Sequence, residues 1–148
     1  MPELVSTYTS RLYIFGQGLA DGSDNKKEVW KILYDQFKKT EPEKRQFVVL
    51  VGYLSACAES SPEFYNSTLD NLIHDELLDQ WFPVFQGDKL IDHRGVERLL
   101  EALETGRANV GAFRHLAWGG HHETISDDDL ADIIKKLQSF HTFRRCIR

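Results

Sequence analysis

The sequence has few of the residues that mark special classes of protein. Two cysteines among 148 residues are too few for a disulfide framework, and Cys57 stands among apolar residues as a small core residue. The most apolar stretch, Phe47 to Leu54, is far shorter than the roughly 20 residues that a membrane helix needs. The N-terminus carries Glu3 and has neither the positive charge nor the apolar core of a signal peptide. We therefore expect a protein of the reducing cytoplasm that does not enter a membrane.

An excess of basic charge is also missing. The formal net charge is −5 at pH 7, which argues against broad binding to nucleic acid or to an anionic membrane surface. Gly16 and Gly18 suggest a dinucleotide-binding loop, but Asp21 stands where that loop needs its third glycine. These glycines are better interpreted as sites of close helix packing, with Gly22 at a helix end. We therefore expect no cofactor.

The rest of the composition is that of an ordinary globular domain. Hydrophobic residues make up 41% of the chain and charged residues 28%, close to the averages for soluble proteins. The length suits one domain, and no linker or low-complexity segment divides it. We predict a single all-helical domain over residues 1–148, and we leave open whether residues 140–148 are ordered or form a disordered tail.

Apolar residues recur at helical spacing along almost the whole chain. Trp30, Leu33 and Phe37 lie on one face of a helix predicted over residues 24–40. The run Phe47–Val51 has the composition of a buried strand, but the pattern continues to Ser60 and its length favours a helix. Helix-start and helix-stop residues place the predicted helices at 4–20, 24–40, 42–60, 62–75, 92–106, 110–118 and from 126 onward, with an apolar stretch at 78–85 that is kinked or stopped at Pro83.

Several helix ends carry clear local signals. Asp92 is an N-cap residue, and Gly106 supplies the left-handed residue that ends the same helix. Ser126 and Asp129 form a capping box at the start of the last helix. No helix alternates with a strand. The sequence therefore predicts an all-α fold of about seven helices, arranged as stacked antiparallel helical hairpins in an irregular HEAT-like α-solenoid.

Four short stretches of these helices share a pattern with a known family: Val51–Ala56, Asp79–Gln86, Ile91–Leu100 and Phe113–Gly119. They resemble helical repeats near the C-terminal end of large bacterial signal-transduction NTPases with numerous domains, some of which act in phage defence. The resemblance implies a HEAT-like sensor or scaffold region that binds another protein. Because this sequence has no Gly-rich phosphate-binding loop, the resemblance implies a free-standing bacterial recognition module, linked to mobile elements or phage defence.

Charged and aromatic residues favour a binding function over catalysis. In a helical repeat, partners bind in the groove between successive hairpins, and aromatic and arginine side chains dominate interface energetics. We therefore expect a non-catalytic protein-binding module whose groove carries Trp81, Arg94, Arg98, Arg114, His115 and Trp118. A second copy of the chain is a further expected partner, because Phe140, Phe143 and Ile147 would leave a solenoid end apolar.

A histidine-rich segment supports a second hypothesis, a metal-dependent enzyme. The candidate ligands are His115, His121, His122 and Glu123, just ahead of a run of aspartates that ends at Asp129. Zinc needs three or four such ligands. The second histidine of the helical zinc-protease motif is absent after His122 and Glu123, however. A polar turn between two helices is the alternative interpretation of this segment.

Lysines on one predicted helix support a third hypothesis, nucleic-acid binding. They are Lys26, Lys27, Lys31, Lys38 and Lys39. Basic patches contact phosphates while neighbouring aromatic residues stack on bases. The exposed face of an amphipathic helix carries the same residues, however. Because the whole chain is also acidic, nucleic acid is not the expected partner.

Overall fold

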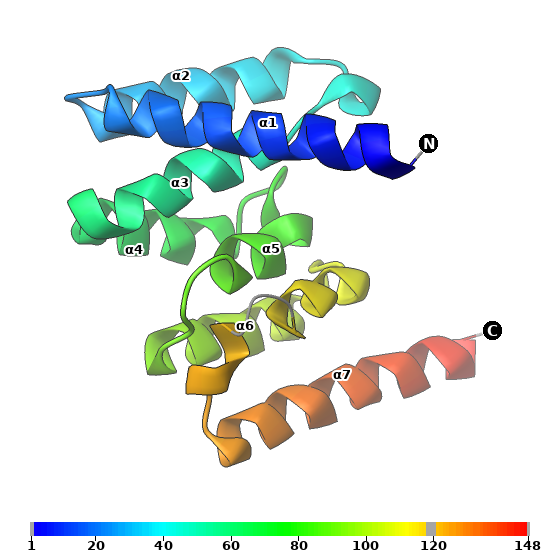
Figure 1. Ribbon diagram of the computed structural model, residues 1–148. Helices are drawn as coiled ribbons and strands as arrows, with labels where there is room; N and C mark the ends of the chain where they lie inside the picture. Colours follow the sequence, from blue (N-terminus) through cyan, green and yellow to red (C-terminus); the bar gives the residue numbers. More distant parts are fainter. Residues whose placement is uncertain (1, 118–120, 148) are drawn as a thin grey trace. The chain divides into compact units, whose positions relative to one another are not determined.

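The computed structural model describes residues 2–117 and 121–147, with side chains described over residues 10–114, at 116 and over 122–139. The α-helices are α1 (Pro2–Asp21), α2 (Lys26–Lys39), α3 (Val48–Ser60), α4 (Pro62–Leu72), α5 (Phe82–Gly87), α6 (His93–Thr105) and α7 (Asp127–Ile147). The described ranges contain no strand, which confirms the predicted all-α fold of seven helices (Figure 1). None of the helices described there is long and apolar enough to cross a membrane.

The chain divides into two compact units, residues 1–68 and 69–148. In the first unit, α1 and α2 form a helical hairpin, and α3 lies against α1 (Figure 1). The backbones of α1 and α3 touch. A Cβ atom added to Gly16 would lie 2.2 Å from the carbonyl oxygen of Val49, and one added to Gly52 would lie 2.1 Å from that of Tyr13. Close helix packing is therefore confirmed for Gly16, whereas Gly18 faces open space.

Tyr53 and Cys57 of α3 form the core of the first unit, and both are fully buried. The Tyr53 hydroxyl donates a hydrogen bond of 2.7 Å to the carbonyl oxygen of Lys26, which ties α3 to the start of α2. Burial raises the pKa of the Tyr53 hydroxyl, although a hydrogen bond with Ser23 acts in the opposite direction. Burial also raises the pKa of the Cys57 thiol, to about 11. Cys57 is thus the small core residue that the sequence predicts, and its thiol stays protonated at neutral pH.

Two helix starts in the first unit differ from the prediction. α2 begins at Lys26, two residues after the predicted start, because Asn25 is its N-cap: the Asn25 Oδ1 atom accepts a hydrogen bond of 3.2 Å from the backbone N–H of Glu28. Pro42 begins only a short 3₁₀ turn, η1 (Pro42–Lys44), and α3 starts later, at Val48. The strand considered for Phe47–Val51 does not form, since all but the first of these residues are helical.

Arg45 explains why the helix does not start at Pro42. Its Nε atom donates to the carbonyl oxygens of Phe37 and Thr40, both at 3.0 Å, and its Nη2 atom donates to that of Lys38 at 3.0 Å. These carbonyls have no partner within α2, as is usual in a last helical turn. Because the Arg45 side chain is used to close α2, its backbone stays extended and interrupts the predicted helix.

In the second unit, α6 has the ends that the sequence predicts. The Asp92 carboxylate accepts a hydrogen bond of 2.8 Å from the backbone N–H of Gly95, and Gly106 has a left-handed φ of 72°. Pro83 was expected to kink or stop a helix, but it stands in the first turn of α5 instead. Proline is tolerated there because the first backbone N–H groups of a helix have no intrahelical partner.

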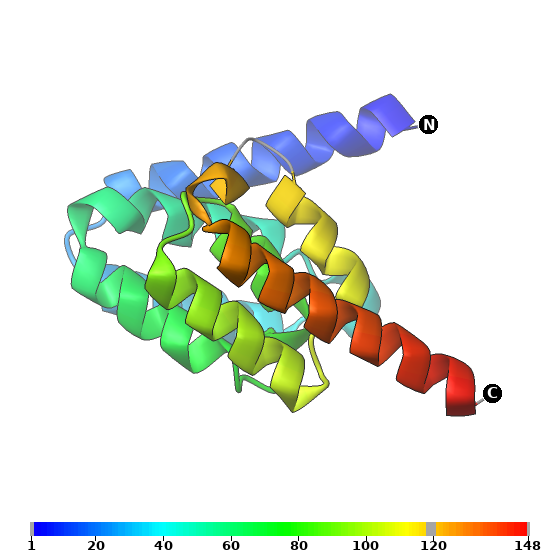
Figure 2. The same cartoon turned by 90° about the horizontal axis from the view of Figure 1, so that it is seen from below.

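The helices α6 and α7 run side by side in the same direction (Figure 2). Near the start of both, His93 Nδ1 lies 3.7 Å from Asp129 Oδ2, and further along Lys136 pairs with Glu104. The Ser126 hydroxyl accepts a hydrogen bond of 3.2 Å from the backbone N–H of Asp129, as its predicted capping role requires.

The chain between α6 and α7 contains two 3₁₀ segments, η3 (Val110–Ala117) and η4 (His121–Thr124). A helix was predicted at the first of these, so its type differs from the expectation. The predicted end of this helix, at residue 118, lies outside the described residues. The backbone of α7 is helical as far as Ile147.

Candidate functional site

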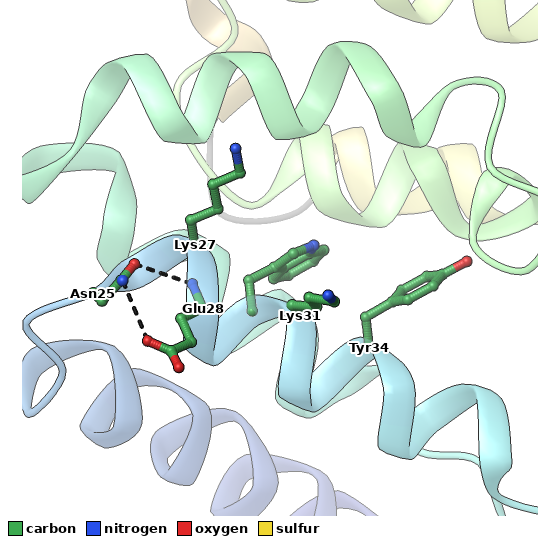
Figure 3. Close-up of a pocket in the computed structure, with 6 residues that line it drawn as sticks. Asn25, Lys27, Glu28, Lys31 and Tyr34 are labelled. Atoms are coloured by element: carbon green, nitrogen blue, oxygen red, sulfur yellow. Dashed lines mark hydrogen bonds between the residues drawn. The ribbon is translucent and has the colours of Figure 1, made fainter.

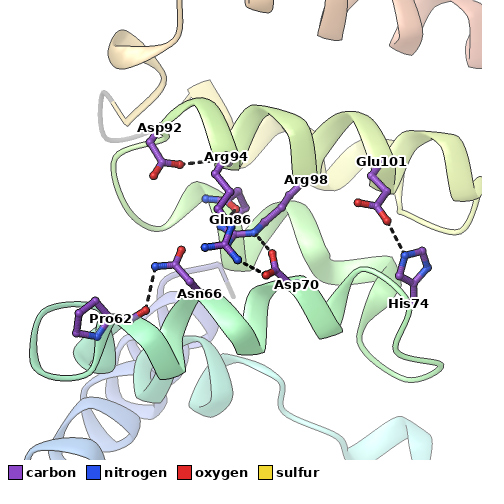
Figure 4. Close-up of polar contacts among 10 residues, drawn as sticks. Pro62, Asn66, Asp70, His74, Gln86, Asp92, Arg94, Arg98 and Glu101 are labelled. Atoms are coloured by element: carbon purple, nitrogen blue, oxygen red, sulfur yellow. Dashed lines mark hydrogen bonds and ion pairs between the residues drawn. The ribbon is translucent and has the colours of Figure 1, made fainter.

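Two of the predicted groove residues, Arg94 and Arg98, meet at one carboxylate (Figure 4). Arg98 Nε donates a hydrogen bond of 2.6 Å to Asp70 Oδ1, and Arg94 pairs with the other oxygen, Oδ2. Arg98 Nη1 also donates to Gln86 Oε1 at 3.3 Å. The Arg98 side chain is only 4% exposed, compared with 52% for Arg94. The guanidinium of Arg98 therefore serves an internal ion pair and is not offered to a partner.

Asp70 is held ionised by this arrangement. Partial burial alone would raise the pKa of its carboxyl group. The hydrogen bonds and positive charges of Arg98 and Arg94 have the larger combined effect and leave the pKa below its ordinary value. An ionised carboxylate between two arginines has no proton to exchange at neutral pH. The cluster therefore joins the last turn of α4 to α6, which is a structural role.

The structure does not bring the other predicted groove residues to this cluster. Trp81 is half-buried at the end of a 3₁₀ turn, η2 (Asp79–Trp81), and Arg114 is exposed on η3. The side chains of His115 and Trp118 lie outside the described residues. Of the predicted groove residues whose side chains are described, Arg94 and Arg114 are exposed, Trp81 is half-buried and Arg98 is buried.

The histidine-rich segment is described only in part. His122 is half-buried, its Nδ1 atom has no hydrogen-bond partner among the described residues, and Glu123 is exposed. The side chains of His115 and His121 are not described. Over the part of the chain with described side chains, no three His, Cys, Asp or Glu residues gather as a metal site would require. The metal hypothesis therefore stays a prediction.

Two further histidines have carboxylate neighbours. His74 Nε2 lies 2.7 Å from Glu101 Oε1, and His93 Nε2 lies 3.5 Å from Glu97 Oε1. All four side chains are more than half exposed. These contacts are the surface pairs expected of a solvated helix face.

A hollow that the sequence analysis did not identify lies at the start of α2 (Figure 3). Its volume is about 470 Å³. Its lining comes from the N-cap residue of α2 and one face of the helix: Asn25, Lys27, Glu28, Trp30, Lys31 and Tyr34. We call this the α2 hollow.

Trp30 lines the α2 hollow and is held in place by core contacts. Its ring centroid lies 6.1 Å from that of Tyr53 at an interplanar angle of 37°, and 6.5 Å from that of Phe64 in an edge-on arrangement. Both neighbours belong to the core of the first unit or pack against it. The indole of Trp30 is therefore shared between the core and the α2 hollow, which is why its periodicity resembles that of a core residue.

Lys27 and Lys31 give the α2 hollow its charge. Both side chains are exposed one turn apart on the helix, and neither forms an ion pair with any residue whose side chain is described. Glu28 lies on the edge of the hollow, where its carboxylate accepts a hydrogen bond of 3.3 Å from Asn25 Nδ2. The hollow thus carries two ammonium groups and one carboxylate.

Lys26 has a different role from its neighbour in sequence. Its ammonium group donates hydrogen bonds to the carbonyl oxygens of Ala20 and, at 2.8 Å, of Ser23. These groups stabilise the end of α1. In the sequence, Lys26, Lys27 and Lys31 belong to one basic helix face. The one sequence signal that Lys27 and Lys31 differ in role from Lys26 is their helical spacing from Trp30 and Tyr34.

Comparison with known proteins adds no further assignment. No family model, no curated protein and no solved structure matches this chain.

Proposed function

We propose that this chain is a protein-binding helical module and that its binding surface includes the α2 hollow. The observation that carries the proposal is a tryptophan fixed by core contacts and bordered by two lysines that lack ion-pair partners among the described residues. Tryptophan is enriched among the residues that dominate binding energy at protein interfaces. A ring that is already ordered loses little side-chain entropy when a partner binds.

Exposed apolar residues on α1 also support binding by the first unit. Ile14 and Phe15 are adjacent in sequence and are 63% and 58% exposed. Large apolar side chains that gather on a surface mark interaction sites more often than single ones do. The proposed surface therefore has two parts in the first helical hairpin, one apolar on α1 and one of mixed character on α2.

The wider setting of the module rests on the sequence resemblance and is part of the proposal. We propose a HEAT-like recognition module of the bacterial cytoplasm that acts without catalysis. Among the originally predicted residues, Arg94 and Arg114 remain candidates for surface contact, because both are exposed. Arg98 is left out since it is buried.

Affinity capture from nuclease-treated bacterial lysate tests this function. The bait is the full chain, compared with the double variant Lys27→Gln/Lys31→Gln and with Lys38→Gln/Lys39→Gln, which removes the same charge from the other end of α2. We expect one co-purifying protein at near-equal stoichiometry with the wild type and the control, and a marked loss with the first variant. Equal capture by all three would place the binding surface elsewhere, and no partner at all would contradict the function.

A further inference from the structure

We infer that the α2 hollow receives an acidic segment of a partner protein, with an apolar side chain seated on Trp30 and carboxylates placed at Lys27 and Lys31. This inference rests on the proposed function and names the chemistry of the partner. Three features of the hollow lead to it: its charge, its aromatic lining residues and the limited extent of the basic surface around it.

The positive charge of the hollow favours binding of an anionic group. Lys27 and Lys31 are four residues apart on one helix face, where like charges repel each other. No described acidic side chain relieves this repulsion by pairing with either ammonium group. The whole chain is acidic, with a net charge of −5, whereas the lining of the hollow carries two ammonium groups and one carboxylate. A carboxylate from a partner would pair with ammonium groups that still face solvent.

The aromatic lining residues of the hollow favour binding of an apolar group. The volume of about 470 Å³ lies within the usual range for ligand pockets, roughly 300–1,000 Å³, and accommodates one or two side chains. Trp30 and Tyr34 contribute aromatic carbon to the lining of the hollow. Because Trp30 is fixed by Tyr53 and Phe64, the surface exists before the partner arrives. Leucine or phenylalanine next to glutamate or aspartate has this combination of groups.

The extent of the basic surface favours a protein segment over nucleic acid. A single-stranded nucleic acid needs a positive groove that follows several phosphates. Here Lys26 is used by the carbonyls of α1, and Lys38 and Lys39 lie in the last turn of α2, beyond the hollow. Asp24, just before the N-cap residue of α2, and Glu28, in its first turn, carry exposed carboxylates. The site is therefore the size of a few peptide side chains.

Selection from a random peptide display library tests the inference directly. The folded full chain is the target, and the double variant Lys27→Gln/Lys31→Gln is the counter-target, so only peptides that need both lysines are retained. We expect enrichment of peptides with aspartate or glutamate beside leucine, isoleucine, phenylalanine or tryptophan. Enriched peptides without acidic residues, or no enrichment over the counter-target, would overturn the inference.

Affinities of one selected peptide then test each part of the site. Each single lysine-to-glutamine variant should weaken binding by about two- to fivefold, as is typical of exposed ion pairs, and Lys39→Gln should leave it unchanged. Trp30→Ala should weaken binding by more than about tenfold. Since Trp30 also packs on the core, circular dichroism must show that this variant is folded. If Trp30→Ala is not folded, Tyr34→Ala and the lysine variants test the same surface.

Two further outcomes separate this inference from the proposed function. If a fluorescent oligothymidylate binds the wild type and loses affinity with the lysine double variant while no peptide is enriched, the hollow is a nucleic-acid site and the inference fails. If affinity capture yields a partner that the double variant binds equally well, the protein-binding function stands and only the role of the α2 hollow is wrong.

Discussion

Arg98 places a guanidinium group where almost no solvent reaches it. A buried charge is tolerated only when its partners are present, and here they are Asp70 and Gln86. At the residue scale, Arg98 is therefore a buried charge whose loss should destabilise the second unit.

Replacement of Arg98 by methionine keeps the length of the side chain and removes its charge. We expect Arg98→Met to lower the free energy of unfolding by about 2 kcal/mol, because the contact to Asp70 and the hydrogen bond to Gln86 are both lost. Arg94→Met is the matched control, since its more exposed ion pair should contribute less than about 1 kcal/mol. Urea denaturation measures both values, and equal losses would contradict the distinction.

The carboxyl group of Asp70 gives the stability of the fold an acid dependence. In the folded state its pKa lies below the ordinary value of 3.8, so the unfolded chain binds more protons as the pH falls through this range. The stabilisation is therefore fully present above about pH 4 and is lost progressively below it. Asp70→Asn should be less stable at neutral pH and should show a shallower decline below pH 4. Parallel stability curves for the two proteins, measured by urea denaturation, would refute this.

At the scale of the elements, the contact of α1 with α3 is the tightest in the first unit. The two helices approach so closely that backbone atoms of each occupy the space where the other would carry a side chain. Gly16 and Gly52 are the residues that allow this approach. A Cβ atom added at either position would therefore clash with backbone atoms of the other helix, which cannot move aside as a flexible side chain can.

Three alanine substitutions distinguish the effect of this contact on stability from the effect of helix propensity. Gly16→Ala and Gly52→Ala should each lower the free energy of unfolding by at least about 2 kcal/mol, because the helices must move apart. Gly18→Ala lies in the same helix as Gly16, and no atom lies within 4 Å of its added Cβ. It should stabilise the protein by about 0.5–1 kcal/mol through helix propensity alone. Thermal and urea denaturation of the three variants decide the matter, and similar effects at Gly16 and Gly18 would contradict the role of the contact.

The helix ends that could be predicted are those whose partners are close in sequence. Asp92 accepts from a backbone N–H three residues on, and Gly106 needs only its own backbone freedom. The start of α3 could not be predicted, because Arg45 reaches back to carbonyls as far as eight residues earlier. Pro83 shows a related ambiguity, since proline is equally suited to the first turn of a helix and to its end.

The candidate site was harder to predict than the fold for a comparable reason. Trp30 has the periodicity of a core residue and does contact the core. Nothing in the pattern therefore reveals that it also lines the α2 hollow. Lys26 and Lys27 are neighbours with the same chemistry, and only the folded end of α1 distinguishes their roles. For Arg98, the apolar periodicity of α6 does not show that Asp70 lies opposite. For Trp30 and Arg98 the deciding contacts are distant in sequence, and for Lys26 they are near in sequence but depend on how α1 ends.

On the scale of the whole molecule, each compact unit makes most of its contacts within itself. Hydrogen exchange can show whether the units also lose structure separately. We expect Gly16→Ala to accelerate exchange mainly in α1, α2 and α3, and Arg98→Met to accelerate it mainly in α6 and α7. If either variant accelerates exchange equally in all helices, residues 1–148 unfold as one unit, as the prediction of a single domain implies.

The connection from α2 to α3 also bears on how the length of this protein can vary. Glu41, Pro42, Glu43 and Lys44 are all exposed, which usually identifies a loop that tolerates inserted residues. Arg45 makes this segment different, because its guanidinium binds two carbonyls of α2 and that of its C-cap residue Thr40, and lies 5.5 Å from the ring centroid of Phe37. An insertion or deletion here would shift Arg45 away from the end of the helix. Length differences among natural variants should therefore avoid this short surface segment, and an epitope tag or a reporter domain belongs elsewhere.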